Sequence, residues 1–161
     1  MFYDQYDLSK NCQSRIEYIN GMPAAAIRAC IHDPLQKDNV IPAMEIFHEE
    51  IQAIAGHSDI IVESNKFVVH PIFQRKSLKL KYDLFSFIFN LSIKAGARCV
   101  VTAVREEHAK FYKKMNFYSI SGVKRYPGLN FDTVLLASDM SSANELPAKI
   151  QQRFSIQPTA A

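Results

Sequence analysis

The chain has 161 residues, of which 48% are hydrophobic and 22% are charged, and its formal net charge is +3. This length and balance suit a single folded domain with its own core and exclude a disordered chain. The small basic excess fits an anionic cofactor or an acidic partner protein, and it is too small to indicate binding to nucleic acid.

The first half of the chain predicts a β-hairpin followed by a helix. Residues 13–20 alternate as a strand does, Asn20-Gly21 signals a tight turn, and residues 22–31 form the return strand. After a loop over 32–40, Pro42 suits the start of a helix that extends to Gly56. Its apolar positions at helical spacing are Met44, Phe47, Ile51 and Ile54.

The second half predicts strands that alternate with helices. The expected elements are a strand over 60–69 ended by Pro71, a helix over 77–95 stopped by Gly96, a strand over 99–104, a short helix over 106–115, and strands over 117–123 and 133–137. This order indicates one mixed α/β domain over residues 1–140. The remaining residues, 141–161, form a tail with a possible helix over 144–154.

The cysteines and histidines show no pattern of a disulfide or metal site. Cys12, Cys30 and Cys99 are widely spaced and lack a CxxC arrangement, so we expect reduced thiols in the core. The histidines have no ligand spacing, and we expect no metal site. Without a signal peptide or an apolar run of about 18 residues, the sequence predicts a cytoplasmic protein with no membrane span.

A phosphate site is predicted where the strand over 60–69 gives way to the next helix. Unpaired N–H groups at a helix start and the cations of Gln74-Arg75-Lys76-Ser77-Leu78 suit a phosphate, and a solvated basic turn is the alternative. The same strand carries Glu63 and Lys66 in apolar surroundings, where charges are costly unless they are paired or used. Glu63 is therefore either a general base or the partner of Lys66 or Arg28 in a salt bridge.

Three further groups of residues have two interpretations each. Tyr112 either gives a proton to a leaving thiolate or packs as an amphipathic side chain. Asp4 and Asp7 either bind an amine or cation or are simply solvated. Phe85 and Phe89, with Ile88 between them, either line an acyl tunnel or belong to the core.

Several short motifs, taken together, resemble the GNAT superfamily of N-acyltransferases. The run Glu107-His-Ala-Lys-Phe-Tyr-Lys-Lys-Met-Asn-Phe117 resembles the signature "FYxKxGF", with Asn116 in place of the usual glycine. Residues 63–69 resemble the strand motif "ExSRFxV" of acyl-homoserine lactone synthases and long-chain N-acyl amino acid synthases, with Lys66 where arginine is usual. Asp4-Gln-Tyr-Asp7 resembles their "DxYD" motif, and Arg28 lies on the strand where they carry an arginine.

The resemblance covers about residues 3–137 and implies a three-layer α/β/α (α+β) fold with a mixed, mostly antiparallel sheet. It implies transfer of a long-chain acyl group from acyl carrier protein, or from acyl-CoA, to the amino group of an amino acid. No tightly bound cofactor is implied, and both a monomer and a dimer are compatible. The alternatives are an acyl-homoserine lactone synthase and a non-catalytic module that binds acyl groups or carrier protein.

The resemblance also assigns roles to residues. Glu63 accepts the amine proton, Arg28 binds the acceptor carboxylate or orders Glu63, and Tyr112 protonates the thiolate, with Lys66 counted among the catalytic set. The residues assigned to the donor are Phe67, Val68, Val69, Gln74, Arg75, Lys76, Ser77 and Leu78. The residues assigned to the acceptor and acyl chain are Asp4, Asp7, Phe85 and Phe89.

Two departures from the family pattern affect these expectations. The usual phosphate loop is Q/R-x-x-G-x-G/A, but Ser77 and Lys79 occupy the glycine positions here. Because a side chain hinders the close approach of a pyrophosphate, the single phosphate of carrier-protein pantetheine fits better than coenzyme A. The sequence begins at the acidic motif, so we expect the helices that precede this motif in the family to be missing.

Overall fold

The computed structural model describes residues 4–36, 39–126 and 130–140, apart from the side chains of residues 75–77. The strands are β1 (Cys12–Ile19), β2 (Met22–His32), β3 (Ile61–Val69), β4 (Cys99–Arg105), β5 (Tyr118–Ser119), β6 (Lys124–Arg125) and β7 (Asp132–Asp139). The α-helices are α1 (Met44–Ile54), α2 (Ser77–Ala95) and α3 (Ala109–Lys113). Short 3-10 helices are η1 (Gln5–Leu8), η2 (Pro71–Lys76) and η3 (Glu106–His108).

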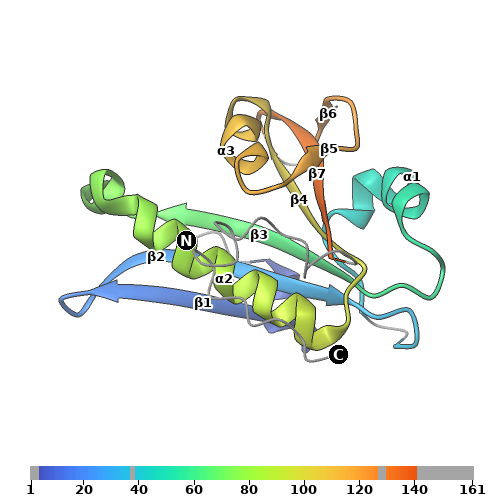
Figure 1. Ribbon diagram of the computed structural model, residues 1–161, viewed down its shortest axis with the longest axis horizontal. Coiled ribbons are helices and arrows are strands. Elements are labelled where there is room, and N and C mark those ends of the chain that lie inside the picture. Colours follow the sequence, from blue (N-terminus) through green and yellow to red (C-terminus); the bar gives the residue numbers. More distant parts are fainter. Residues whose placement is uncertain (1–3, 37–38, 127–129, 141–161) are drawn as a thin grey trace.

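The strands form one seven-stranded sheet in the order β1-β2-β3-β4-β7-β5, with β6 also paired to β7. The β3–β4 pair is parallel, and the other pairs are antiparallel. In Figure 1, α2 lies along β1, β2 and β3, while α1 lies at the other end of the molecule. The mixed, mostly antiparallel sheet predicted from the sequence is confirmed.

Two apolar cores lie on opposite faces of the sheet. Alternate strand residues point to opposite faces, so Val100 belongs to the core under α2 and α3, whereas Val101 belongs to the core under α1. Leu136 and Leu135 divide between the same two cores. Helices therefore cover both faces, which confirms the three-layer arrangement.

Three residues with positive φ explain local features of the sequence. Asn20 and Gly21 have φ of 50° and 77°, as the predicted two-residue hairpin turn requires. Asn116, at the place of the family's usual glycine, has φ of 65°. Asparagine adopts this left-handed conformation more readily than most other residues, so the turn that connects α3 to β5 is preserved.

Three predicted elements differ from the observed ones. The helix predicted to end at Gly56 spans Met44–Ile54, with a non-helical φ of −113° at Phe47. The helix predicted over 106–115 is a 3-10 turn followed by the short α3. The strand predicted over 117–123 pairs in the ladder only over β5, because the Ser121 hydroxyl accepts the N–H of Leu135 at 2.7 Å in place of a backbone carbonyl.

The prediction of three reduced cysteines was wrong for two of them. Cys12 and Cys30 are direct partners on β1 and β2, with Cα atoms 4.1 Å apart, and they form a disulfide. Directly opposed residues of antiparallel strands bring their side chains together, which sequence spacing alone does not reveal. Cys99 is a free, buried thiol, as expected.

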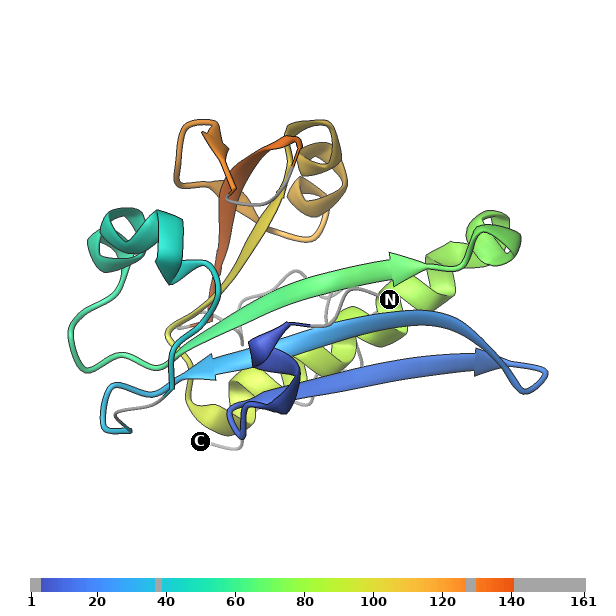
Figure 2. The same cartoon turned by 180° about the vertical axis from the view of Figure 1, so that it is seen from behind.

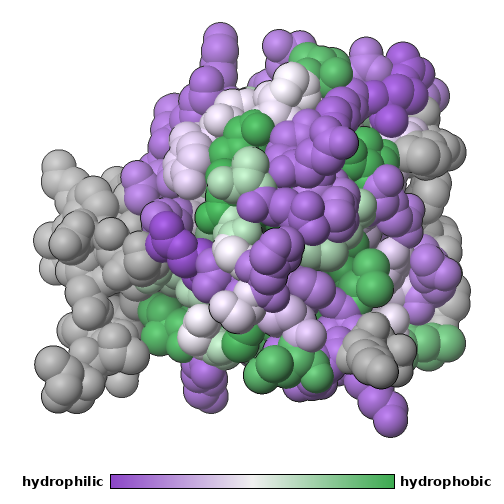
Figure 3. All heavy atoms as spheres, turned by 90° about the vertical axis from the view of Figure 1, so that its right-hand side faces the viewer, coloured by the Kyte–Doolittle hydropathy of each residue, from purple (hydrophilic) through white to green (hydrophobic). Residues whose placement is uncertain are grey.

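On the side of the molecule that carries α1, the described surface shows no large continuous apolar patch. Figure 3 shows the side of the molecule that carries α1, where hydrophobic side chains lie in small groups among hydrophilic ones. Among the residues that the structure describes, none of the helices combines the length and apolar character needed to cross a membrane. The predicted tail over 141–161, including the helix over 144–154, lies outside the described residues.

Candidate active site

The candidate active site begins where β3 separates from β4. The parallel ladder joins Ile61, Val62 and Glu63 to residues 99–101 and extends no further in the described strands. Beyond it, Lys66 has φ of 49°, and the register with β2 shifts between Ala26 and Arg28, as in a β-bulge. Figures 1 and 2 show the two strands diverging from this point. Glu63 therefore occupies the last paired position before the strands separate.

Glu63 is a buried residue of β3 whose carboxyl group lies at the start of α1. Only 2% of the residue is exposed, and its Oε2 accepts the backbone N–H of Ala43 at 2.8 Å. This amide precedes the first turn of α1 and lacks a partner within the helix, so the carboxyl group caps it. Burial raises the pKa of Glu63 to about 7, against the opposing effects of Ala43, Asn65 and the charge of Arg28. A carboxyl group of this kind is suited to accept and release protons near neutral pH.

An acid–base cluster of Asp4, Asp7, Arg28 and Lys66 lies beside Glu63. The guanidinium of Arg28, 3% exposed, binds Asp4 Oδ1 at 2.6 Å and Asp7 Oδ1 at 2.9 Å. Lys66 Nζ lies 2.5 Å from Asp7 Oδ2 and 3.1 Å from Asp4 Oδ2. Two cations therefore neutralise two carboxylates, and hydrogen bonding to Lys66 lowers the pKa of Asp7 to about 2.

This cluster bears on the two interpretations of Glu63. In the described part of the chain, Arg28 and Lys66 form ion pairs with Asp4 and Asp7. Arg28 Nε also donates to Asn65 Oδ1 at 2.7 Å, which links the cluster to β3. Figure 2 shows η1 lying across the β1–β2 hairpin. Arg28 thus holds the acidic motif in place, and its role toward an acceptor carboxylate stays a prediction.

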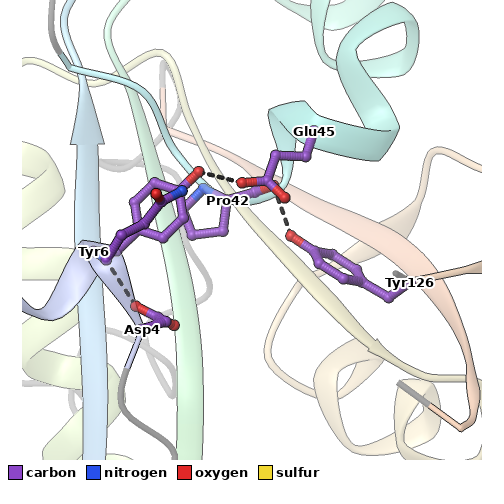
Figure 4. A pocket seen from close by; sticks show the side chains of 6 residues that line it. Asp4, Tyr6, Pro42, Glu45 and Tyr126 are labelled. Atoms are coloured by element: carbon purple, nitrogen blue, oxygen red, sulfur yellow. Dashed lines mark hydrogen bonds between the residues drawn. The ribbon is translucent and has the colours of Figure 1, made fainter. Parts of the chain in front are cut away.

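A pocket of about 350 Å³ opens next to these residues. Its lining residues are Asp4, Gln5, Tyr6, Pro42, Glu45 and Tyr126. In Figure 4, Glu45 extends from α1 between the two tyrosines. Tyr6 Oη donates to Glu45 Oε1 at 2.5 Å, and Tyr126 Oη donates to the carbonyl of Pro42 at 2.6 Å.

Sequence reasoning missed most of this lining. Glu45 and Tyr126 were not singled out, and Tyr6 entered only as part of the acidic motif. Glu45 has the pattern of a solvated helix residue, and Tyr126 lies in a loop, so neither carries a local signal. They are revealed only by long-range contacts: Glu45 contacts Tyr6, 39 positions earlier, and Tyr126 contacts Pro42, 84 positions earlier.

The residues predicted for the acyl chain and the thiolate lie on the other face of the sheet. Phe85 and Phe89 are fully buried in the core under α2. Tyr112, 5% exposed, packs its ring against Phe85 with centroids 5.6 Å apart, and burial raises its pKa to about 12. This environment matches the packing interpretation of all three side chains, and their predicted roles in the reaction stay predictions.

The predicted donor-binding residues follow the bulge along β3 and enter α2. Val68 is 58% exposed, and Val68 and Val69 pair with β2. Phe67 turns to the other face, where its ring lies 5.4 Å from that of Phe85. Residues 71–76 form η2 rather than the predicted turn, with Gln74 exposed, and Leu78 in α2 is 59% exposed. The side chains of Arg75, Lys76 and Ser77 lie outside the description, so the phosphate site stays a prediction.

The seven-stranded sheet, the separating strands and the helices on both faces define the GNAT fold of N-acyltransferases. The family model of the N-acyl amino acid synthase FeeM matches residues 1–139, and the chain belongs to this family. A comparison with curated proteins finds no match. In the described part of the chain, no group of three or more histidine, cysteine or acidic side chains is arranged to hold a metal ion.

Solved structures share the fold at low sequence identity. The structure of FeeM, an N-acyl amino acid synthase from uncultured soil microbes, gives a TM-score of 0.74 at 14% identity, over 86% of this chain and 78% of that one. The CoA-dependent acyl-homoserine lactone synthase BjaI with MTA gives 0.67 at 13% identity, over 98% and 70% of the two chains. TofI in a ternary complex with an inhibitor and MTA gives 0.65 at 15% identity, over 98% and 76%.

Proposed function

We propose that this chain transfers a long-chain fatty acyl group from acyl carrier protein, or from acyl-CoA, to the amino group of an amino acid. The observation that carries the proposal is Glu63, a buried carboxyl group with a pKa of about 7. It lies where β3 leaves β4, in a member of the FeeM family. We also propose that the enzyme acts in the cytoplasm.

The reaction requires a neutral amine and a polarised thioester. The amine nitrogen attacks the carbonyl carbon, a C–N bond forms, the C–S bond breaks, and the thiolate leaves and takes up a proton. Glu63 accepts the proton lost by the amine. Because Glu63 does not line the pocket, we propose that a water molecule relays this proton.

The donor would lie along β3 beyond the bulge. Backbone N–H groups around Val68 and Val69 are candidates to polarise the thioester carbonyl and to pair with pantetheine. Arg75, Lys76 and Ser77 are the candidates to hold its phosphate. Tyr112, 5% exposed, is the proposed proton donor to the thiolate.

The test measures thiol release from hexadecanoyl acyl carrier protein and from hexadecanoyl-CoA, with a panel of amino acids and mass spectrometry of the products. We expect N-acyl amino acids, and Glu63→Gln should lower kcat by about 100-fold or more. Glu49→Gln, on the exposed side of α1, controls for the loss of one carboxylate. Wild-type turnover by Glu63→Gln would exclude Glu63 as the base.

The same assay separates the alternative functions. The fold shared with the acyl-homoserine lactone synthase BjaI favours such a synthase as the second candidate, and S-adenosylmethionine as acceptor would then yield a lactone. Binding of the carrier protein without thiol release would indicate a non-catalytic module. For the donor site, Arg75→Ala combined with Lys76→Ala should weaken donor binding in a salt-dependent way, and an unchanged affinity counts against that site.

A further inference from the structure

We propose that the acceptor carries a second positively charged group besides the amine that is acylated, as a basic amino acid does, and that Glu45 binds this group in the pocket between Tyr6 and Tyr126. The inference rests on the proposed acyl transfer and adds the chemical class of the acceptor. The pocket's volume of about 350 Å³ is in the range of sites for small molecules, about 300 to 1,000 Å³.

The charge of the lining is the first argument. Of the six lining residues, two are acidic and none is basic. Asp4 is already neutralised, since it pairs with Arg28 and Lys66. Within the described residues, no cation pairs with Glu45, and its carboxylate accepts the hydroxyl of Tyr6. The pocket therefore keeps one negative charge that an acceptor can neutralise.

The direction of the hydrogen bonds is the second argument. Tyr6 donates its hydroxyl proton to Glu45, and Tyr126 donates its proton to the carbonyl of Pro42. Both tyrosine oxygens consequently offer only lone pairs to a ligand. A carboxylate or carbonyl of the ligand would find few donors here, whereas an ammonium or guanidinium group brings several N–H donors and no acceptor. The faces of the tyrosine rings also attract cations.

The electrostatic environment supports this polarity. Burial raises the pKa of Tyr126, and the charges of Glu63 and Glu45 raise it further. Burial and the hydrogen bond to Glu45 raise the pKa of Tyr6 to about 12. Both phenols therefore sense the same negative potential, which favours a cation in the space between them.

The pocket is also placed for the reaction. Pro42 lines it, and the next residue, Ala43, donates its N–H to the carboxyl group of Glu63. The proposed cation site and the proposed base are thus joined through two consecutive residues at the start of α1. A molecule with two basic groups can place one, as a cation, at Glu45. Its other basic group, an amine that has lost its proton, is then directed toward the thioester.

The test uses pairs of acceptors that differ by one charge, lysine with norleucine and arginine with citrulline. Thiol release and product mass are measured with hexadecanoyl acyl carrier protein and hexadecanoyl-CoA. The wild-type enzyme should have a kcat/KM at least about tenfold higher for the charged member of each pair. Glu45→Gln should reduce this ratio about tenfold, mainly through KM, while Glu49→Gln should preserve it.

Each outcome has a separate meaning. Equal or better turnover of norleucine and citrulline by the wild type overturns the inference and leaves the proposed acyl transfer standing. An unchanged lysine-to-norleucine ratio in Glu45→Gln overturns the role of Glu45, provided that thermal unfolding shows the variant to be folded. Absence of any acylated product from all four acceptors and from the wider amino-acid panel refutes the proposed function itself.

Discussion

Replacing Glu63 by glutamine should make the protein more stable at neutral and alkaline pH while removing its activity. Glutamine has nearly the same shape, and its carbonyl oxygen can still accept the N–H of Ala43. It cannot ionise, however. The variant therefore separates the cost of a buried charge from the packing of the side chain that carries it.

The size of the effect follows from the pKa. Burial raises the pKa of Glu63 from 4.5 to about 7, so the folded state favours the protonated carboxyl group. The protonation of Glu63 contributes to the free energy of unfolding in full below pH 4.5. This contribution is lost as the pH rises from 4.5 to about 7, and it stays lost above pH 7. Because one pKa unit corresponds to about 1.4 kcal/mol, the loss amounts to about 3 kcal/mol.

Urea unfolding from pH 5 to pH 8 measures this difference. The free energy of unfolding of Glu63→Gln should rise relative to wild type by about 2 to 3 kcal/mol across that range. Glu49→Gln, which removes an exposed carboxylate, should follow the wild type. Parallel pH dependences of wild type and Glu63→Gln would refute the raised pKa. The kcat/KM of the wild type should increase as the pH passes about 7, since the base must be deprotonated.

Three further substitutions or treatments test the surroundings of this group. Arg28→Gln should lower the free energy of unfolding by about 2 kcal/mol, because the two aspartates lose their buried partner but keep Lys66, and unchanged thermal unfolding contradicts this. Asp7→Asn should move the pH midpoint of activity down by about one unit, because it leaves more of the positive charge of Lys66 and Arg28 to act on Glu63; a shift to higher pH would count against this coupling. Reduction of the Cys12–Cys30 disulfide, which spans 18 residues, should lower stability by about 3 kcal/mol, and Cys12→Ser should make urea unfolding insensitive to reductant.

The elements that the sequence predicted well are those with local signals. Asn20-Gly21 specifies the hairpin turn through its positive φ angles, and the regular apolar spacing of residues 77–95 specifies α2. The strand predicted over 117–123 failed because its pairing depends on β7 and on the hydroxyl of Ser121, which is not visible in the pattern of apolar residues. The disulfide was missed for the same reason, since it depends on the register of two strands.

The residues of the candidate site also divide into those with a local sequence signal and those without one. Short motifs led to Glu63, Arg28 and the two aspartates, and the structure brings these residues together. Glu45 and Tyr126 could not be found in this way, because a glutamate on the exposed side of a helix and a tyrosine in a loop are common features. Their meaning comes from tertiary contacts with Tyr6 and Pro42.

The arrangement of charges explains how a carboxyl group in this region keeps a pKa near neutrality. Arg28 lies on the strand next to Glu63 and would lower this pKa strongly if its guanidinium bound the carboxylate. Its Nη atoms bind Asp4 and Asp7 instead, and η1 fixes these two residues through a capping box in which each side chain binds the other's backbone. The acidic motif thereby withdraws the nearby cation from Glu63, so that burial dominates its pKa. In this view, Asp4 and Asp7 act on the proton chemistry through Arg28 and Lys66, while the proposed binding site for the acceptor's second charge is Glu45.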